Sequence, residues 1–287
     1  MLGTLQIQGD DGRRVSVAPG NAEKLLTVLL LRKGQVVSYD QLADEIWDDQ
    51  PPRSALAALH VYISQLRKTL GTLLTGGPAA RNPIETRPPG YLLRLHQNDE
   101  VDMDDFQHRV GRGRDALAAG RCEEASQRLG EALDLWREPV LGHRQGGRVL
   151  AGFMAWAEEA RLECLELKME SEMALGRHHA LVAPLRRLVI EHPLRETLHR
   201  QLMLALYRAD RQGDALKAYH QATEALDREL GLAPGRALRE MYRAIISAEA
   251  PSAGTPPPEP HSPLLPASTT LLPKGSPWAL HPTRNPS

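Results

Sequence analysis

The sequence predicts a mainly α-helical protein of three parts: a small α+β domain, an all-α domain of helical repeats and a disordered tail. Short segments of alternating apolar and polar residues flank helical patterns within residues 1–96, which indicates strands and helices in one domain. Seven long amphipathic patterns fill residues 97–250 and indicate helices alone. Residues 251–287 hold 11 of the 22 prolines and too little apolar surface to offset the entropy of ordering.

Composition and charge set the broad class of protein. With 287 residues and 41% hydrophobic residues, the chain is long enough for two domains with cores of their own. The formal net charge is -1, but residues 1–96 carry 11 Lys and Arg against 9 Asp and Glu, whereas residues 97–250 carry 22 against 26. The two cysteines are far apart, and neither a long apolar run nor a signal-peptide pattern occurs, so we expect a soluble cytoplasmic protein.

The first 96 residues predict an amino-terminal hairpin or meander, three helices and a terminal hairpin. LGTLQIQ and RRVSVA alternate around the turn sequence GDDG, and IETRPPGYLLRL turns at Pro-Pro-Gly. Between these hairpins, AEKLLTVLLLRK is a helix that ends at Gly34, and Ser38 is a suitable cap for the helix YDQLADEIWDD. A third helix begins near Arg53 or Ser54 and ends at Gly71. This order, with a hairpin after the third helix, is the layout of a winged helix-turn-helix.

The third helix has an apolar side and a polar side. Residues three and four apart share one face of a helix, and on the predicted buried face these are Leu56, Leu59, Ile63, Leu66 and Leu70. The opposite face holds Ala57, Ala58, Val61, Gln65 and Lys68, with His60 and Ser64 on one shoulder and Tyr62 on the other. Gln can bond adenine, Val and Ala can touch thymine methyl groups, and Arg67 and Lys68 can meet phosphates. The outer face therefore has the chemistry of a reader of the DNA major groove.

The second hairpin is predicted to be the wing of this domain. Arg87, at its turn, can reach a phosphate or the minor groove, where the negative potential is high. The candidate DNA-binding residues are Arg53, Ala57, His60, Val61, Tyr62, Ser64, Gln65, Arg67, Lys68, Thr86, Arg87 and Tyr91. Plainer explanations stay open, because most amphipathic helices that end in Arg and Lys are core helices with solvated charges. Tyr91 can simply pack, and Thr86 can simply be a strand residue.

The seven helices predicted in the second part point to stacked hairpins. They are VDMDDFQHRVGRGRDALAAGR, EEASQRLGEALDLWRE, FMAWAEEARLECLELKMESEMALGR, HHALVAPLRRLVIEHP, LRETLHRQLMLALYRADR, GDALKAYHQATEALDRELG and PGRALREMYRAIISAE. Three of them end in related sequences, ALAAGR, EMALGR and LYRADR, at residues 121, 177 and 211. The last interval is 34 residues, the tetratricopeptide period, and the first is 56, which requires a longer or additional helix. Such stacks usually serve as binding scaffolds.

No pattern in the sequence indicates an enzyme, so we predict no catalytic residue, cofactor or metal site. Four histidines lie close in sequence: His178, His179, His192 and His199. No HExxH occurs, and positions on helix surfaces explain these histidines better than a metal site does. Asp102, Asp104 and Asp105 lack the glycine and distal glutamate of a calcium loop and are better explained as first-turn helix charges. Neither a P-loop nor a Gly-x-Ser-x-Gly sequence is present.

Several stretches resemble one family of regulators. LGTLQI, VLLLRKGQVVSYDQLADEIWDD, ALHVYISQLRKTLG and TRPPGYLLRL resemble the DNA-binding domain of the Streptomyces antibiotic regulatory protein family, whose fold is similar to the winged helix of OmpR-type response regulators. Further along, EALDLWREPVL, HPLRE, LMLALYRADRQGDAL and GLAPG resemble the bacterial transcriptional activation domain that follows it. QLRKTLG and RPPGYLLR are the most specific pieces of the first match. The family often has a basic residue where Gln65 stands, so base preference does not carry over.

The resemblance implies a transcriptional activator rather than an enzyme. Its implied partners are double-stranded DNA with promoter direct repeats in secondary-metabolite clusters, RNA polymerase, and a second copy of the chain on DNA. Its implied parts are a winged DNA-binding domain over 1–96, a tetratricopeptide-like activation domain over 97–250 and the tail over 251–287. The alternative is a helical-repeat adaptor whose winged domain binds protein. DNA binding that prefers particular repeats and weakens steeply with salt would separate the two.

Overall fold

The structure is a computed structural model in which residues 1–9, 11–48, 50–73, 82–96, 98–140 and 146–247 are described. The tail expected over residues 251–287 lies outside this set. Most of the described residues are helical, and the chain divides into two compact units. The described residues of the first unit fall within 1–107 and 134–161, and those of the second within 108–133 and 162–247.

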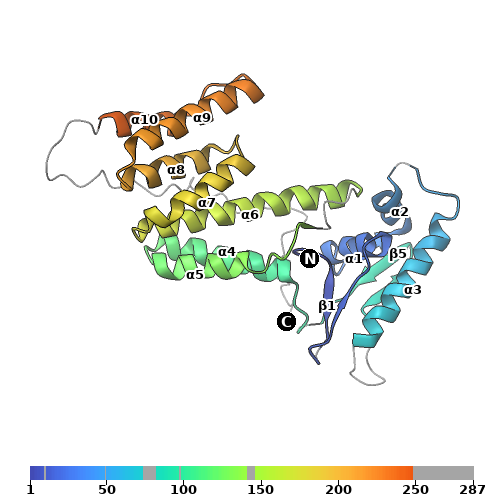
Figure 1. Ribbon diagram of the computed structural model, residues 1–287. Coiled ribbons are helices and arrows are strands. Elements are labelled where there is room, and N and C mark those ends of the chain that lie inside the picture. Colours follow the sequence, from blue (N-terminus) through green and yellow to red (C-terminus); the bar gives the residue numbers. More distant parts are fainter. Residues whose placement is uncertain (10, 49, 74–81, 97, 141–145, 248–287) are drawn as a thin grey trace, which may run out of the picture. The chain divides into compact units, whose positions relative to one another are not determined.

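The first unit contains the predicted winged helix-turn-helix (Figure 1). Its elements in chain order are β1 (Gln6–Gln8), β2 (Arg14–Ser16), α1 (Asn21–Leu31), β3 (Val36–Ser38), α2 (Tyr39–Trp47), α3 (Ala55–Leu73), β4 (Ile84–Arg87) and β5 (Gly90–Leu93). β1 and β2 form the first predicted hairpin, in which Ile7 pairs with Val15. β4 and β5 form the second, and the order of their sheet is β3-β5-β4. Both hairpins predicted from the sequence are therefore confirmed.

β3 is a strand that the sequence did not indicate. Its three residues are too few for alternation to stand out, and the strand exists because Val37 pairs with Tyr91 of β5. Gly90 permits this approach, since a Cβ atom at that position would lie 1.8 Å from the carbonyl oxygen of Val37. The glycine of the Pro-Pro-Gly sequence thus completes a turn and also allows the wing to pair closely with β3.

Local capping and a shared core set the three helices in place. The side chain of Ser38 accepts a hydrogen bond from the backbone amide of Gln41 at 3.2 Å, and the side chain of Gln41 accepts one from the backbone amide of Ser38 at 3.1 Å. This capping box confirms the predicted start of α2. Each of the three helices contributes fully buried aliphatic side chains to the core: Leu25, Leu29, Leu42, Leu59 and Ile63.

The buried face of α3 is shifted toward its end relative to the prediction, because the helix continues past the predicted end at Gly71 to Leu73, which is buried. Leu59 and Ile63 are each 1% exposed, and Leu66 is 2% exposed. Leu56, in contrast, is 49% exposed, so its predicted burial is wrong. Periodicity gives the direction of a side chain around the helix axis, but it does not tell whether a neighbour is present at that height along the axis.

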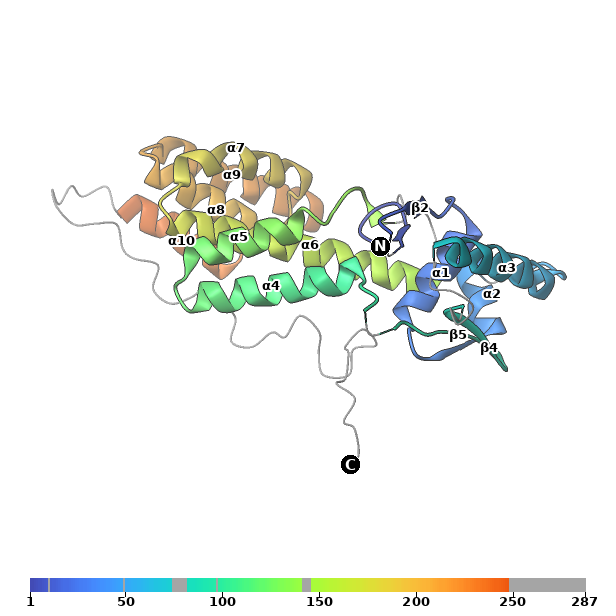
Figure 2. The same cartoon turned by 90° about the horizontal axis from the view of Figure 1, so that it is seen from below.

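The seven helices predicted in the second part are all found among the described residues (Figure 2). They are α4 (Asp102–Ala118), α5 (Cys122–Leu133), α6 (Arg148–Ala174), α7 (His178–Glu191), α8 (Glu196–Arg208), α9 (Gln212–Leu230) and α10 (Arg236–Ser247). α4 and α6 each have residues in both units. None of the described helices combines the length and the apolar character that crossing a membrane requires.

The turns after α4, α6 and α8 share one backbone conformation. Gly120, Gly176 and Asp210 have φ angles of 72°, 75° and 57°, in the left-handed region. They occupy equivalent places in ALAAGR, EMALGR and LYRADR, so the similarity of those sequences reflects a repeated turn between two antiparallel helices. Asp210 is the one residue of these three that carries a side chain in this conformation.

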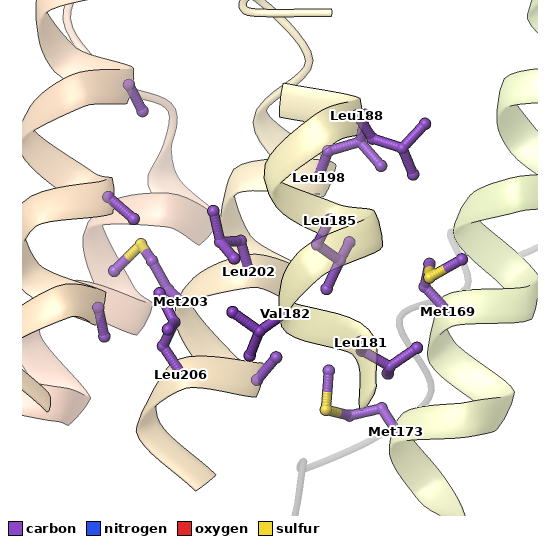
Figure 3. Packing of buried hydrophobic residues seen from close by; sticks show 14 of the residues in the cluster. Met169, Met173, Leu181, Val182, Leu185, Leu188, Leu198, Leu202, Met203 and Leu206 are labelled. Atoms are coloured by element: carbon purple, nitrogen blue, oxygen red, sulfur yellow. The ribbon is translucent and has the colours of Figure 1, made fainter. Parts of the chain in front are cut away.

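The core of the second unit is built from the facing sides of α6 to α10 (Figure 3). Met169 and Met173 of α6 lie against Leu181 and Leu185 of α7. On the other side of α7, α8 contributes Leu198, Leu202, Met203 and Leu206, and α9 contributes Ala215, Ala218 and Ala222. The small alanines let α9 approach α8 closely, which is the packing expected of a helical repeat.

α5 ends at Leu133, five residues before the predicted end at residue 138. The segment that follows belongs to the first unit, where the ring of Trp136 meets the edge of Phe106 with centroids 5.4 Å apart. The guanidinium group of Arg161 lies 5.4 Å from the Trp136 ring centroid. The helical pattern up to residue 138 was misleading because this tryptophan packs against α4 and α6 rather than continuing the face of α5.

Candidate nucleic-acid interface

α3 presents one free face within the first unit. Its apolar side packs against α1 and α2, and Val61, on the opposite side, is 53% exposed. Val61 is therefore a large apolar side chain that the core of this unit does not use. The exposed candidate residues on and just before α3 are Arg53, Ala57, His60, Val61, Ser64, Gln65 and Lys68. The outward placement expected for them from helical periodicity is what the structure shows.

The exposed face of α3 carries positive charge and no negative charge. The sequence from residue 50 to residue 84 contains no Asp or Glu, so α3 carries no carboxylate. In the part of the chain that the structure describes, no hydrogen bond or ion pair engages the side chains of Arg53 and Lys68. Both cations are therefore available to an anionic partner. The absence of acidic residues from 50 to 84 can be seen in the sequence, but the charge count of the whole domain does not show it.

The wing carries two arginines that share one carboxylate, Arg87 beside its turn and Arg94 just after β5. Arg87 pairs with Glu85 at 3.0 Å, and Arg94 reaches the other carboxylate oxygen of Glu85 at 3.0 Å. The hydrogen bond from Arg87 is the main reason that the pKa of Glu85 lies below its usual value. Thr86 and Arg87 are both exposed, as expected for residues at a wing. Because one anion faces two cations, this group gives the wing a net positive charge.

Tyr62 and Tyr91 both have partners within the domain, Tyr62 as a half-buried side chain and Tyr91 as a buried one. The hydroxyl oxygen of Tyr62 accepts a hydrogen bond from the side-chain amide of Asn21 at 3.2 Å. The centroid of the Tyr62 ring lies 6.4 Å from that of the Trp47 ring. Tyr91 is 3% exposed, and its ring contacts Tyr39 edge-on at 5.5 Å. Burial raises the pKa of Tyr91. This geometry supports the alternative explanation for Tyr91, which is that it packs in the core.

Arg67 differs from its neighbour Lys68 because its side chain is already engaged. The guanidinium group donates to the backbone of Ile84 and to the hydroxyl group of Thr86, both in the wing. Sequence reasoning placed Arg67 at a phosphate, since periodicity cannot show a hydrogen bond to a strand 17 residues away. The structure brings Arg67, Thr86 and Tyr91 together as one group within the domain.

His199 and Asp104, two of the residues considered for metal binding, have other partners. Among the described residues, no group of three or more His, Cys, Asp or Glu side chains could hold a metal ion. His199 is only 5% exposed, so its assignment to a helix surface is wrong; its Nε2 atom lies 2.9 Å from the carbonyl oxygen of Pro193. Asp102 and Asp104 stand in the first turn of α4, and Asp104 pairs with Lys33.

Two family models match the chain. The model described as "Transcriptional regulatory protein, C terminal" matches residues 14–93, and the model described as "Bacterial transcriptional activator domain" matches residues 101–246. The second match alone covers about half of the chain. The two matches include the helix-turn-helix with its wing and the helical repeats.

Curated relatives extend the match over most of the chain. The regulatory protein DnrI of Streptomyces peucetius is 35% identical over 252 residues, which are 87% of this chain and 92% of that protein. The transcriptional regulator RedD of Streptomyces coelicolor is 35% identical over 256 residues, 89% of this chain and 72% of that protein. The transcriptional regulatory protein EmbR of Mycobacterium tuberculosis is 37% identical over 246 residues, 86% of this chain. The chain spans 62% of the length of EmbR.

A solved structure has the same fold. It is Mycobacterium tuberculosis EmbR in complex with a low-affinity phosphopeptide, and it matches with a TM-score of 0.77 at 36% sequence identity. The match covers 86% of this chain and 64% of the EmbR chain. The relatives are transcriptional regulators, a family of non-enzymes. The chain therefore belongs to the Streptomyces antibiotic regulatory protein family of transcriptional regulators, in which an OmpR-type winged helix precedes a bacterial transcriptional activator domain.

Proposed function

We propose that this protein is a sequence-specific activator that binds direct repeats in the promoters of a secondary-metabolite gene cluster and recruits RNA polymerase. It would bind double-stranded DNA through the winged domain, over residues 1–96, and act in the cytoplasm at the nucleoid. The observation that carries the proposal is the exposed, carboxylate-free face of α3, whose opposite face is fixed in the core. A rigid helix with such a face can enter the major groove.

Each exposed residue of α3 has a role in this proposal. Ala57 and Val61 offer small apolar contacts to thymine methyl groups, and Gln65, one turn further, can bond an adenine with both atoms of its amide. Lys68 and Arg53 meet phosphates, and His60 and Ser64 line the shoulder of the same groove. These contacts divide the residues into those that read sequence and those that supply affinity.

The wing adds a second contact on the duplex. Arg87 and Thr86 would touch the sugar-phosphate backbone or the adjacent minor groove. Tyr62 and Tyr91 are not carried forward as DNA contacts, because the hydroxyl group of Tyr62 is hydrogen-bonded to Asn21 and Tyr91 is buried. They support the surface instead by holding α3 and β5 in place.

The activation domain, over residues 97–250, would supply contacts with polymerase and with a second copy on adjacent repeats. Two observations support this: a stack of helical hairpins is a scaffold for protein contacts, and the helical part matches the bacterial transcriptional activator domain over residues 101–246. DnrI and RedD, two Streptomyces regulators, are relatives over most of the chain, which supports control of secondary metabolism.

The rival function is an adaptor whose winged domain binds protein. Leu56 and Val61, 49% and 53% exposed, favour it, because exposed apolar side chains also suit a protein partner. The two functions differ in their response to salt. Binding to DNA through phosphates weakens steeply as salt rises, whereas an apolar protein contact does not.

A mobility-shift assay on duplexes selected from a randomised library tests the proposal. We expect the full chain to enrich one repeated sequence and to lose affinity for it as the salt concentration rises. Gln65→Ala should change the preferred base at one position, and Lys68→Ala should weaken binding to all duplexes about equally. Equal binding to every duplex by the wild type and both variants would refute this assignment of roles.

A further inference from the structure

Arg67 is anchored to the wing through the Nε and Nη2 atoms of its guanidinium group. Its Nε and Nη2 atoms donate to the carbonyl oxygen of Ile84 at 3.0 and 2.9 Å. Nη2 also donates to the hydroxyl oxygen of Thr86 at 2.9 Å. Both acceptors belong to β4, so a single side chain of α3 joins that helix to the first strand of the wing.

The backbone at Arg67 is bound to the same segment. The side-chain amide of Asn82 donates to the carbonyl oxygen of Arg67 at 3.0 Å, and its oxygen accepts from the backbone amide of Ile84 at 3.1 Å. The guanidinium carbon also lies 5.7 Å from the ring centroid of Tyr91, on β5. Arg67 therefore contacts both strands of the wing, through Ile84 and Thr86 of β4 and through Tyr91 of β5.

These contacts require arginine rather than any cation. A guanidinium group is planar and presents several donors in a fixed fork, whereas an ammonium group is a compact point charge on a flexible stem. A lysine could meet a phosphate at this place, but it could not bond Ile84 and Thr86 together while covering Tyr91. The side chain of Lys68 has no partner among the described residues. Exchanging lysine for arginine at position 68 would therefore keep the positive charge and any contact that this charge makes with a phosphate.

We infer that Arg67 is a positioning residue, which sets the wing at a fixed place beside the recognition helix, and that it is not a phosphate contact. This inference rests on the proposed function. It assigns to Arg67 the spacing between the bases read by Gln65 and the backbone touched by Arg87. The two strands of the wing are paired as far as Arg87 and Gly90, and Arg67 joins this paired hairpin to α3.

Salt dependence counts the phosphate contacts that a variant has lost, and the combination with Arg87→Ala shows whether Arg67 or Arg87 made the contact. A side chain that neutralises a phosphate releases a counterion, which adds about 0.9 to the slope of log affinity against log salt concentration. A side chain that only places the wing lowers affinity when it is removed, without changing the slope by its own charge. If the wing is displaced, the complex loses the contribution of Arg87 to the affinity and to the slope. Arg87→Ala removes that same contribution.

The experiment measures dissociation constants of the full chain for its best library-selected duplex at a series of salt concentrations. The variants form charge-preserving pairs: Arg67→Lys and Lys68→Arg, with Arg67→Ala and Lys68→Ala beside them. We expect Arg67→Lys and Arg67→Ala each to raise the dissociation constant about tenfold, and Lys68→Arg to stay within about twofold of the wild type. Combining Arg67→Lys with Arg87→Ala should cost no more than either change alone, because both act through the wing.

Asn82→Ala guards against misfolding of the arginine variants, since it removes the side-chain bridge between Arg67 and Ile84 and leaves the arginine and every residue assigned to DNA in place. It should weaken binding by about threefold and, like Arg67→Lys, should leave wing-side protection from hydroxyl radicals reduced while α3-side protection persists. Wild-type affinity in Arg67→Lys, or full additivity with Arg87→Ala, would overturn the inference. A wild-type chain that selects no sequence would instead refute the proposed function, and this result is obtained before any variant is compared.

Discussion

The carboxylate of Glu45 accepts a 2.8 Å hydrogen bond from the backbone amide of Val149 at the start of α6. The other oxygen of Glu45 accepts from the amide of Leu150 at 3.0 Å, and the residue is 5% exposed. A Cβ atom on Gly147 would lie 2.6 Å from the Cα atom of Glu45, so a glycine is needed there. The second helix of the winged domain thus caps a helix from the later part of the chain, 104 residues away.

Removal of this cap should destabilise the protein. Glu45→Ala leaves one buried and one partly buried backbone amide without an acceptor, which costs about 2 kcal/mol in the free energy of unfolding. Chemical denaturation measures the loss, and Asp44→Ala, which alters an exposed neighbouring carboxylate, is the matched control. Unfolding of Glu45→Ala at the wild-type denaturant concentration would show that the cap contributes nothing.

The repeated turns predict opposite effects at two equivalent positions. Asp210 has a left-handed backbone, φ 57°, which costs a residue with a side chain about 1 kcal/mol, so Asp210→Gly should stabilise the fold by about that amount. Gly176→Ala, at the turn after α6 with φ 75°, should destabilise it by about 1 kcal/mol. Thermal melts of both variants check this, and a lower melting temperature for Asp210→Gly would contradict the equivalence of the turns.

The two cysteines should differ in reactivity. Burial raises the pKa of Cys164 to about 12, and its side chain is fully buried, so the reactive thiolate is absent at neutral pH. Cys122 is partly exposed. We expect iodoacetamide to label Cys122 alone in the folded protein and both residues after denaturation, as measured by mass spectrometry of peptides. Labelling of Cys164 at the same rate as Cys122 in the folded protein would show that this burial is incorrect.

Glu172 should make stability depend on acidity. Burial opposes its ionisation, but hydrogen bonds from Ser126 and Arg177 outweigh that effect and lower its pKa below the ordinary value of 4.5. A carboxylate with a depressed pKa stabilises the fold above its unfolded value and loses that contribution as pH falls through its folded value. The stability difference between the wild type and Glu172→Gln, followed by urea denaturation, should therefore be largest near pH 6 and shrink below pH 4.5. A difference that is constant over this range would argue against the ion pair.

Local patterns predicted most of the fold. Ser38 and Gln41 identify the start of α2 because a capping box is written in neighbouring residues, and the outer face of α3 follows from helical periodicity. The burial of Leu56 could not be judged in this way, since it depends on where the partner helices end. β3 was missed because its strand character comes from pairing with β5 rather than from its own three residues.

The candidate site was predictable only in part, because two of its features depend on distant contacts. Gln65 and Lys68 point outward as their spacing indicates. The bonds of Arg67 to Ile84 and the burial of Tyr91 under Arg67 depend on the place of the wing, which a linear pattern does not fix. The capping of α6 by Glu45 has the same origin, since no local signal connects residues 104 apart in the chain.

Site-specific photo-crosslinking tests the central claim most directly. A photoreactive amino acid in place of Gln65, on the full chain bound to its selected duplex, is predicted to link to a base in the centre of the protected half-site. The same group in place of Lys217, an exposed residue of α9, serves as the control and should not link there. Crosslinking at position 65 to no DNA base, while the chain still binds the duplex specifically, would contradict the placement of α3 in the major groove.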